Sequence, residues 1–204
     1  MSLTNERSAD PVIRAFIAID LPAEVIRNLG KSLRYLRQVD IDGMRVARPN
    51  VIHLTLKFIG SSPESLVGDI AGVIEQVTQT HTALELMAGN IGAFPNHQRP
   101  RILWVGIRDE SDRLTAIKKD LDSGLAKLGV PIDKRSYHPH LTIARFRQRR
   151  LSPEHIQTLK EIGPNIPISE MTFPVKSIAL VQSILGPTRS EYIPRSRSVF
   201  AKII

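Results

Sequence analysis

Two histidines of this chain begin nearly the same tetrapeptide. His53 opens His-Leu-Thr-Leu and His140 opens His-Leu-Thr-Ile, although the chain holds only six histidines. An imidazole changes its charge near neutral pH, so one histidine can act as a base while a second, protonated one acts as an acid. A threonine hydroxyl two residues further on can donate a hydrogen bond to a phosphate oxygen. The repeated pattern therefore favours acid–base chemistry at a phosphate group.

Displacement at phosphorus needs a base at the entering oxygen and an acid at the leaving oxygen. Two histidines on opposite sides of a phosphate supply both, and the residues alone do not decide which is the acid. A metal site formed by His138, His140 and His53 is the alternative use of these side chains. Pro139 between two of them and the lack of a suitably placed carboxylate speak against it. We predict no metal and no cofactor.

Both motifs lie in runs typical of β-strands, at 51–59 and 140–146. Successive side chains of a strand point to opposite faces, so each histidine shares a face with its threonine, while the aliphatic residues face a core. Lys57 has the same parity as His53, which places it either at the cleft mouth or at a solvated strand end. Arg145 has the opposite parity to His140 and reaches the same cleft only if the strand bends.

The remaining elements follow from hydrophobic period and capping residues. Each motif strand is followed by Ser-Pro-Glu, at Ser62 and at Ser152, which predicts a helix start and two halves of similar design. Helices alternate with strands, which predicts a mixed α and β domain with helices packed outside sheets. We expect an irregular segment over 184–197. The predicted helices are 23–38, 63–79, 112–128 and 153–162, and the further predicted strands are 14–20, 82–92, 101–107, 172–182 and 198–204.

The bulk properties narrow the class of protein. The chain has 204 residues, which fits one domain, and residues 1–11 are expected to form a flexible tail before it. The absence of cysteine excludes disulfides and thiol catalysis, and no run of 18 apolar residues predicts a membrane span. A cytoplasmic location is therefore expected. The net charge of +8 attracts polyanions, and the basic run Arg145, Arg147, Arg149 and Arg150 follows the second motif.

Five segments of the chain resemble a known family in order and spacing. They are RAFIAIDLP at 14–22, RPNVIHLTLKFIG at 48–60, GAFPNHQRPRILWVGI at 92–107, YHPHLTIAR at 137–145 and V-x-S-x-L at 181–185. The chain is similar to the two-histidine phosphoesterases, and most of all to the RNA 2′,3′-cyclic phosphodiesterases, also called 2′-5′ RNA ligases. The resemblance implies an α+β fold over 12–204. This single domain would have two pseudo-symmetric lobes, each an antiparallel sheet backed by helices, and a central cleft that carries both motifs.

The resemblance also implies an activity and roles for the motif residues. The reaction would open an RNA 2′,3′-cyclic phosphate end to a 2′-phosphomonoester, with 2′-5′ joining of tRNA halves as a related reaction. His53 would be the proton donor and His140 the proton acceptor, and Thr55 and Thr142 would bind the phosphate. The expected partner is RNA with 2′,3′-cyclic phosphate ends, and the protein is expected to be a monomer that needs no membrane. Candidate RNA contacts are Lys57, Arg145 and Arg147.

Two other functions remain open from the residues alone. One is a non-catalytic RNA-binding module that uses the same basic surface. The other is a cyclic phosphodiesterase that acts on a small nucleotide, although the basic run favours a polymer. The salt dependence of binding separates them, because contacts to several phosphates weaken steeply with added salt.

Overall fold

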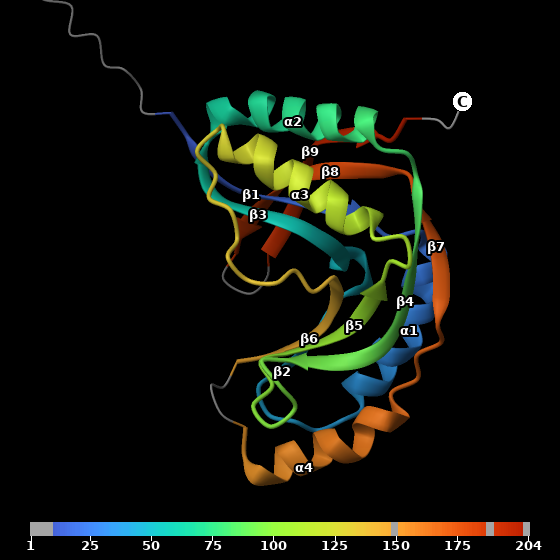
Figure 1. The fold of residues 1–204 in the computed structure, drawn as a ribbon. Helices are drawn as coiled ribbons and strands as arrows, with labels where there is room; N and C mark the ends of the chain where they lie inside the picture. Colours follow the sequence, from blue (N-terminus) through green and yellow to red (C-terminus); the bar gives the residue numbers. More distant parts are fainter. Residues whose placement is uncertain (1–9, 148–150, 187–189, 202–204) are drawn as a thin grey trace, which may run out of the picture.

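A strongly curled sheet forms the body of the molecule (Figure 1). The computed structural model describes residues 10–147, 151–186 and 190–201. Within them the sheet has nine strands in the order β7-β4-β5-β6-β3-β1-β8-β9, with β2 beside β6, and all these pairs are antiparallel. The strands are β1 Val12–Asp20, β2 Met44–Val46, β3 His53–Pro63, β4 Leu84–Phe94, β5 Ile102–Arg108, β6 His140–Phe146, β7 Met171–Val175, β8 Ser177–Leu185 and β9 Ser190–Val199.

The helices cover the outer side of the curled sheet (Figure 1). Helices α2 and α3 pack on the lobe formed by β1, β3, β8 and β9, and α1 and α4 lie on the lobe formed by β2, β4, β5, β6 and β7. None of the helices in the described residues is long and apolar enough to cross a membrane. The α-helices are α1 Ala23–Arg37, α2 Val67–Thr80, α3 Arg113–Ala126 and α4 Pro153–Ile162, and short 3₁₀ turns span Pro49–Val51, Glu64–Leu66 and Gly163–Asn165.

Within the sheet, the strands of the two lobes pair at one residue pair. Strands β3 and β6 pair only through Leu54 and Leu141, the central residues of the two His-Leu-Thr motifs. On one side of this pair β3 is followed by β1, β8 and β9, and on the other side β6 is followed by β5, β4 and β7. This arrangement confirms the predicted α+β fold of two pseudo-symmetric lobes. It also puts the pseudo-twofold axis at the motifs themselves.

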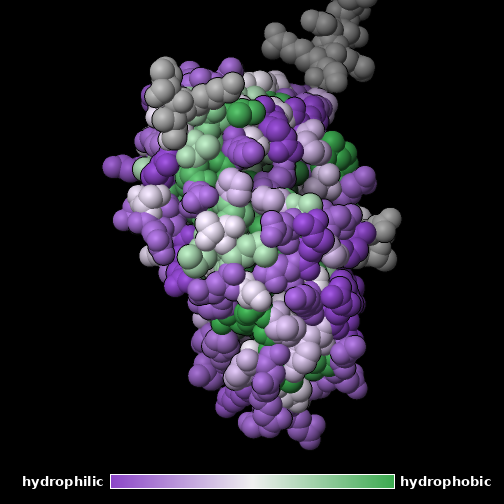
Figure 2. Space-filling view, turned by 90° about the vertical axis from the view of Figure 1, so that its right-hand side faces the viewer, coloured by the Kyte–Doolittle hydropathy of each residue, from purple (hydrophilic) through white to green (hydrophobic). Residues whose placement is uncertain are grey.

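One hydrophobic core runs through both lobes beneath the sheet. It contains the apolar stripes that the helical period predicted, such as Leu29 and Leu33 of α1, Ile74 of α2 and Leu121 of α3. Leu54 and Leu141 are completely buried in the same cluster. Figure 2, which faces α1 and β7, shows an outer surface with mostly hydrophilic side chains and only narrow hydrophobic patches between them.

The two Ser-Pro-Glu sequences have different structures. Ser152 caps α4 as predicted, because its hydroxyl accepts a hydrogen bond from the backbone N–H of His155 at 3.2 Å. The predicted helix start at Ser62 is wrong. Strand β3 continues to Pro63, which pairs with Val12 of β1, and α2 begins only after the turn Glu64–Leu66. Ladder pairing with β1 holds this segment extended where its local sequence favours a helix.

The C-terminal strands also differ from the prediction. The predicted strand 172–182 is two strands, and β7 and β8 belong to different lobes although only Lys176 separates them. Strand β9 fills most of the segment 184–197, which was expected to be irregular. Of the predicted strand 198–204, Ser198 and Val199 are the last residues of β9, and Ala201 forms an isolated β-bridge with Thr82. Residues 202–204 lie outside the described residues. Strand β2 was not predicted.

The predicted flexible tail lies mostly outside the described residues, which begin at Asp10. The carbonyl of Pro11 accepts a hydrogen bond from the N–H of Glu64 at 2.7 Å, and the carboxylate of Asp10 bonds to Ser65. These last two residues of the predicted tail are therefore tied to the connection between β3 and α2.

Candidate active site

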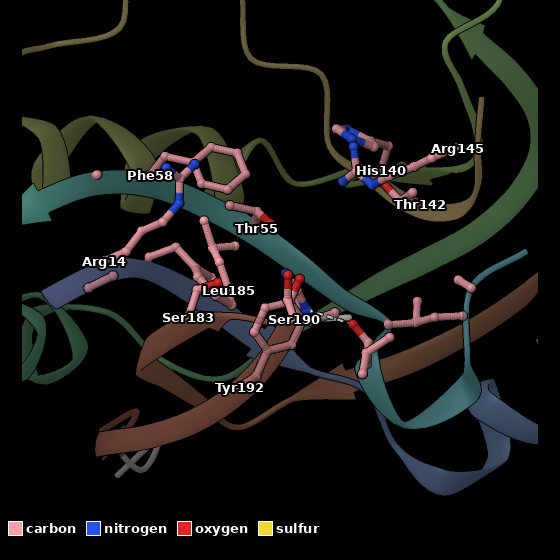
Figure 3. Close-up of a pocket in the computed structure, with 17 residues that line it drawn as sticks. Arg14, Thr55, Phe58, His140, Thr142, Arg145, Ser183, Leu185, Ser190 and Tyr192 are labelled. Atoms are coloured by element: carbon pink, nitrogen blue, oxygen red, sulfur yellow. Dashed lines mark hydrogen bonds between the residues drawn. The ribbon is translucent and has the colours of Figure 1, made fainter. Parts of the chain in front are cut away.

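Both motifs open onto one pocket between the lobes. Antiparallel pairing at Leu54 and Leu141 turns the residues on either side of each leucine to the same face of the sheet. A cavity of about 380 Å³ is lined by His53, Thr55, His140 and Thr142. In Figure 3 the side chains from β6 face those from β3, β1, β8 and β9 across an open space. The fold thus brings together the four side chains that the sequence pattern singled out.

The two histidines make equivalent hydrogen bonds to the backbone. Nδ1 of His53 lies 2.9 Å from the carbonyl oxygen of Val51, and Nδ1 of His140 lies 2.7 Å from that of His138. A carbonyl only accepts hydrogen bonds, so each Nδ1 carries the hydrogen. This fixes the tautomer of both rings and leaves each Nε2 as the atom that gives or takes a proton.

The surroundings of the two imidazoles differ in charge. Burial lowers the pKa of His53, and the charges of Arg145 and His140 act in the same direction, while the bond to the carbonyl of Val51 and the carboxylate of Asp20 raise it. Burial also lowers the pKa of His140, with Arg145 adding to the effect and the carbonyl of His138 opposing it. Of these two histidines, only His53 has a carboxylate among the described residues that acts on its charge. His53 therefore has a feature that favours its protonated form and His140 lacks it.

A β-bulge follows each motif and reverses the alternation of the strand. Opposite β1, pairing passes from Thr55 directly to Lys57, and opposite β5 it passes from Thr142 directly to Ala144. The extra residue in each strand turns the following side chains to the other face. As a result, the side chains five residues after each histidine, Phe58 and Arg145, both line the pocket.

The same bulge buries Lys57, so the prediction that it contacts RNA is wrong. Its side chain is 1% exposed and lies on the core face of β3. Its Nζ lies 2.7 Å from the carbonyl oxygen of Pro131, 3.0 Å from Asp122 Oδ1 and 3.3 Å from Asp133 Oδ2. Lys57 thus joins the first motif strand to the loop that leads into the second.

The arginines after the second motif lie in different surroundings. Arg145 reaches the pocket because the strand bends, as the parity argument required. Arg147 is exposed, its backbone N–H donates to the carbonyl of Gly43 at 3.0 Å, and it does not line the pocket. Arg149 and Arg150 lie outside the described residues.

Aromatic rings hold the imidazoles in place. Phe16 stacks on His53 with ring centroids 4.6 Å apart, and Tyr192 meets the same imidazole edge-on at 5.2 Å. Phe94 meets His140 edge-on at 4.9 Å. Sequence reasoning missed Tyr192, because β9 was expected to be irregular, and Phe58, because its parity points it away from His53. The strict alternation of arginine and serine at 195–198 was the available signal for β9.

Tyr137 is a structural neighbour of the first motif. Its hydroxyl donates a hydrogen bond to the backbone carbonyl of Thr55 at 3.0 Å, and burial raises the pKa of this hydroxyl. The residue three positions before His140 therefore supports the strand that carries His53. No group of three histidine, aspartate or glutamate side chains in the described residues is arranged to hold a metal ion.

The sequence profile of the 2′-5′ RNA ligase superfamily matches residues 22–186, a range that contains both motifs. The chain belongs to this superfamily. An RNA 2′,3′-cyclic phosphodiesterase of Aeropyrum pernix is 32% identical over 142 residues, which cover 70% of this chain and 78% of that protein. The protein of the same name from Archaeoglobus fulgidus is 29% identical over 86% of this chain and 93% of its own.

Solved structures of other proteins share the fold. A Thermus thermophilus protein superposes with a TM-score of 0.76 at 23% identity, covering 92% of this chain and 98% of its own. Escherichia coli LigT, crystallised with 3′-AMP, superposes with a TM-score of 0.73 at 23% identity, covering 94% of this chain and all of its own. The curled sheet of this chain is thus the fold of these proteins.

Proposed function

We propose that this protein hydrolyses the 2′,3′-cyclic phosphate at an RNA end to a 2′-phosphomonoester. One observation carries the proposal: two imidazoles with fixed Nδ1–H tautomers present free Nε2 atoms, with two threonine hydroxyls, to a single pocket. The curated relatives bear the name of this activity. The exposed ring of Phe58, with Tyr192 beside the pocket, suits a nucleobase, because any base stacks on an aromatic face.

The chemistry follows from the proton positions. Nε2 of His140 takes a proton from water as its oxygen attacks phosphorus. The bond from phosphorus to O3′ breaks, and Nε2 of His53 gives its proton to O3′. The products are a 3′-hydroxyl and a 2′-phosphate. Asp20 supports the assignment of His53 as the acid, because its carboxylate favours the protonated imidazole.

The same arrangement supports 2′-5′ joining of RNA ends, including tRNA halves. A 5′-hydroxyl then replaces water as the nucleophile, His140 takes its proton, and O3′ leaves as before. Opening the cyclic phosphate supplies the free energy for forming the new bond, so no nucleoside triphosphate is consumed. We expect the protein to act as a monomer, because both histidines come from one chain.

A product assay tests the proposed hydrolysis. Cytidine 2′,3′-cyclic phosphate and a short RNA with the same end are incubated with the protein in EDTA, and the products are identified by phosphorus NMR. The expected product is the 2′-phosphate. A 3′-phosphate would mean that O2′ leaves instead, and no product from either substrate would overturn the proposal.

The rate of hydrolysis should have a bell-shaped dependence on pH, with its maximum on the acid side of neutrality. One histidine must be neutral and the other protonated, and burial lowers both pKa values from 6.5. The proton on the acid is therefore lost already below pH 6.5 in the free enzyme, and the maximum of kcat/KM is expected below this value. Bound cyclic phosphate is an anion that raises both pKa values, so the maximum of kcat should lie at higher pH. Initial rates across acidic and neutral pH check this, and a single sigmoid would contradict a two-histidine mechanism.

Removing a threonine hydroxyl should weaken catalysis without disturbing the fold. A hydrogen bond to a charged group contributes about 1.5–3 kcal/mol, so Thr142→Val should lower kcat/KM by roughly 10- to 10²-fold. Thr142→Ser keeps the hydroxyl and should keep most of the activity. A large loss in Thr142→Ser with little loss in Thr142→Val would mean that the methyl group, rather than the hydroxyl, matters.

A further inference from the structure

A pair of arginines lies at the rim of the pocket on the second lobe. Arg45 of β2 is directly opposite Arg145 of β6 in the antiparallel ladder. The pairs on either side of them, Met44 with Phe146 and Val46 with Ala144, turn toward the core, where Phe146 and Ala144 are buried. Arg45 and Arg145 therefore share the opposite, solvent-facing side, and both are exposed.

No acidic side chain in the described part of the chain forms an ion pair with either arginine. Like charges directly opposite each other on neighbouring strands are destabilising, since their Cβ atoms are only about 4.5–5.5 Å apart. Other arginines of the protein do have such partners, as Arg195 has Glu64 and Arg197 has Asp20. The pair at the rim is thus a place where a bound anion would offset a repulsion.

The position of the pair relative to the motif suggests which anion it binds. From the junction at Leu54 and Leu141, β6 runs away from β3 and pairs next with β2. Arg145 lies three residues beyond Thr142, about 10 Å along the strand, and it lines the pocket, whereas Arg45 lies outside it. An RNA chain whose cyclic end lies between the histidines has its preceding phosphate one nucleotide away, and a chain that leaves the pocket along β6 brings that phosphate to this rim.

We propose that Arg45 and Arg145 together bind the phosphate that precedes the terminal nucleotide, and that Arg45 makes the enzyme prefer an oligonucleotide end to a mononucleotide. The inference rests on the proposed function and adds a second phosphate site to it. Guanidinium groups bind phosphate oxygens in pairs of parallel hydrogen bonds. On the opposite rim Phe58 occupies the position equivalent to Arg145. One lobe therefore offers an aromatic ring on which a nucleobase can stack, and the other offers arginines that can bind the RNA phosphate backbone.

The test compares two substrates with the same reacting end. The values of kcat/KM are measured for cytidine 2′,3′-cyclic phosphate and for the dinucleotide ApC with a 2′,3′-cyclic phosphate. Arg45→Gln is expected to lower the value for the dinucleotide about tenfold, as for one lost charged hydrogen bond, and to leave the mononucleotide within about twofold. A dinucleotide with an uncharged methylphosphonate linkage should lose at least this factor with the wild-type protein, because both arginines lose their anion, and it should be unaffected by the substitution.

Arg27→Gln is the matched control, because Arg27 is an exposed arginine of α1 on the outer side of the molecule. It removes the same charge and should change neither value. Equal losses for both substrates in Arg45→Gln, or no loss for the dinucleotide, would overturn the inference while leaving the hydrolase intact. A wild-type protein that hydrolyses neither substrate would overturn the proposed function and the inference with it.

Discussion

Replacing either histidine with alanine is expected to lower kcat for cyclic phosphate hydrolysis by about 10²- to 10⁴-fold, the usual contribution of a positioned acid or base. His53 and His140 line one pocket with equivalent tautomers, so both losses should be large. The substrate is cytidine 2′,3′-cyclic phosphate, followed by phosphorus NMR. His97→Ala is the matched control, since this histidine is exposed on a loop outside the pocket.

A second substrate separates the acid from the base. In a 3′-deoxynucleoside 2′-(p-nitrophenyl phosphate), nitrophenolate takes the place of O3′ and leaves without needing a proton. His53→Ala should therefore recover much of its loss on this substrate, while His140→Ala should not. Recovery in the His140 variant instead would interchange the two roles. Similar losses in both variants on both substrates would contradict any division into acid and base.

Replacing Lys57 is expected to have the largest effect on stability. Removing one member of a buried ion pair leaves an uncompensated charge and costs about 3–5 kcal/mol in the free energy of unfolding. Lys57 is almost wholly buried and lies between Asp122 and Asp133. Asp122 keeps a second partner in Lys118, so we expect a loss near the lower end, about 3 kcal/mol, for Lys57→Met. Urea unfolding measured by circular dichroism gives this value.

Two further variants test where this energy comes from. Lys31→Met removes an exposed lysine of α1 and should change the free energy of unfolding by no more than about 0.5 kcal/mol. Asp133→Asn acts on a carboxylate that is 56% exposed, so its loss should be at most about 1 kcal/mol. If Lys57→Met also costs less than about 1 kcal/mol, the buried ion pair does not stabilise the fold.

The sequence predicted most of the fold because local signals were strong. The apolar stripe of α1 and the cap at Ser152 depend only on residues that are close together in the sequence. The structure has both helices nearly at the predicted bounds. The errors occur where pairing with a strand from another part of the sequence determines the local structure. Pro63 stays extended because Val12 pairs with it, and β9 forms because β8 lies beside it. Neither partner can be identified from the local sequence.

The candidate site shows the same division. The histidines and threonines were found from their repeated pattern, and alternation placed them correctly up to the threonine of each motif. The bulge after each threonine then reversed the expected faces, so that Lys57 is buried and Arg145 reaches the pocket. A bulge depends on the register of the neighbouring strand, and alternation within one strand cannot reveal it. Arg45 was missed because the three residues of β2 carry too little pattern.

The path of the chain through the two lobes has a consequence for its synthesis. β1 belongs to one lobe, the following helix α1 packs on the other, and β7 and then β8 and β9 complete the two lobes in turn. On the ribosome, β1 therefore has no partner on its β8 side until residues 177–185 have been made. Its open edge is a site for wrong pairing with other nascent chains. A chain that ends before β8 lacks the strand that covers this edge.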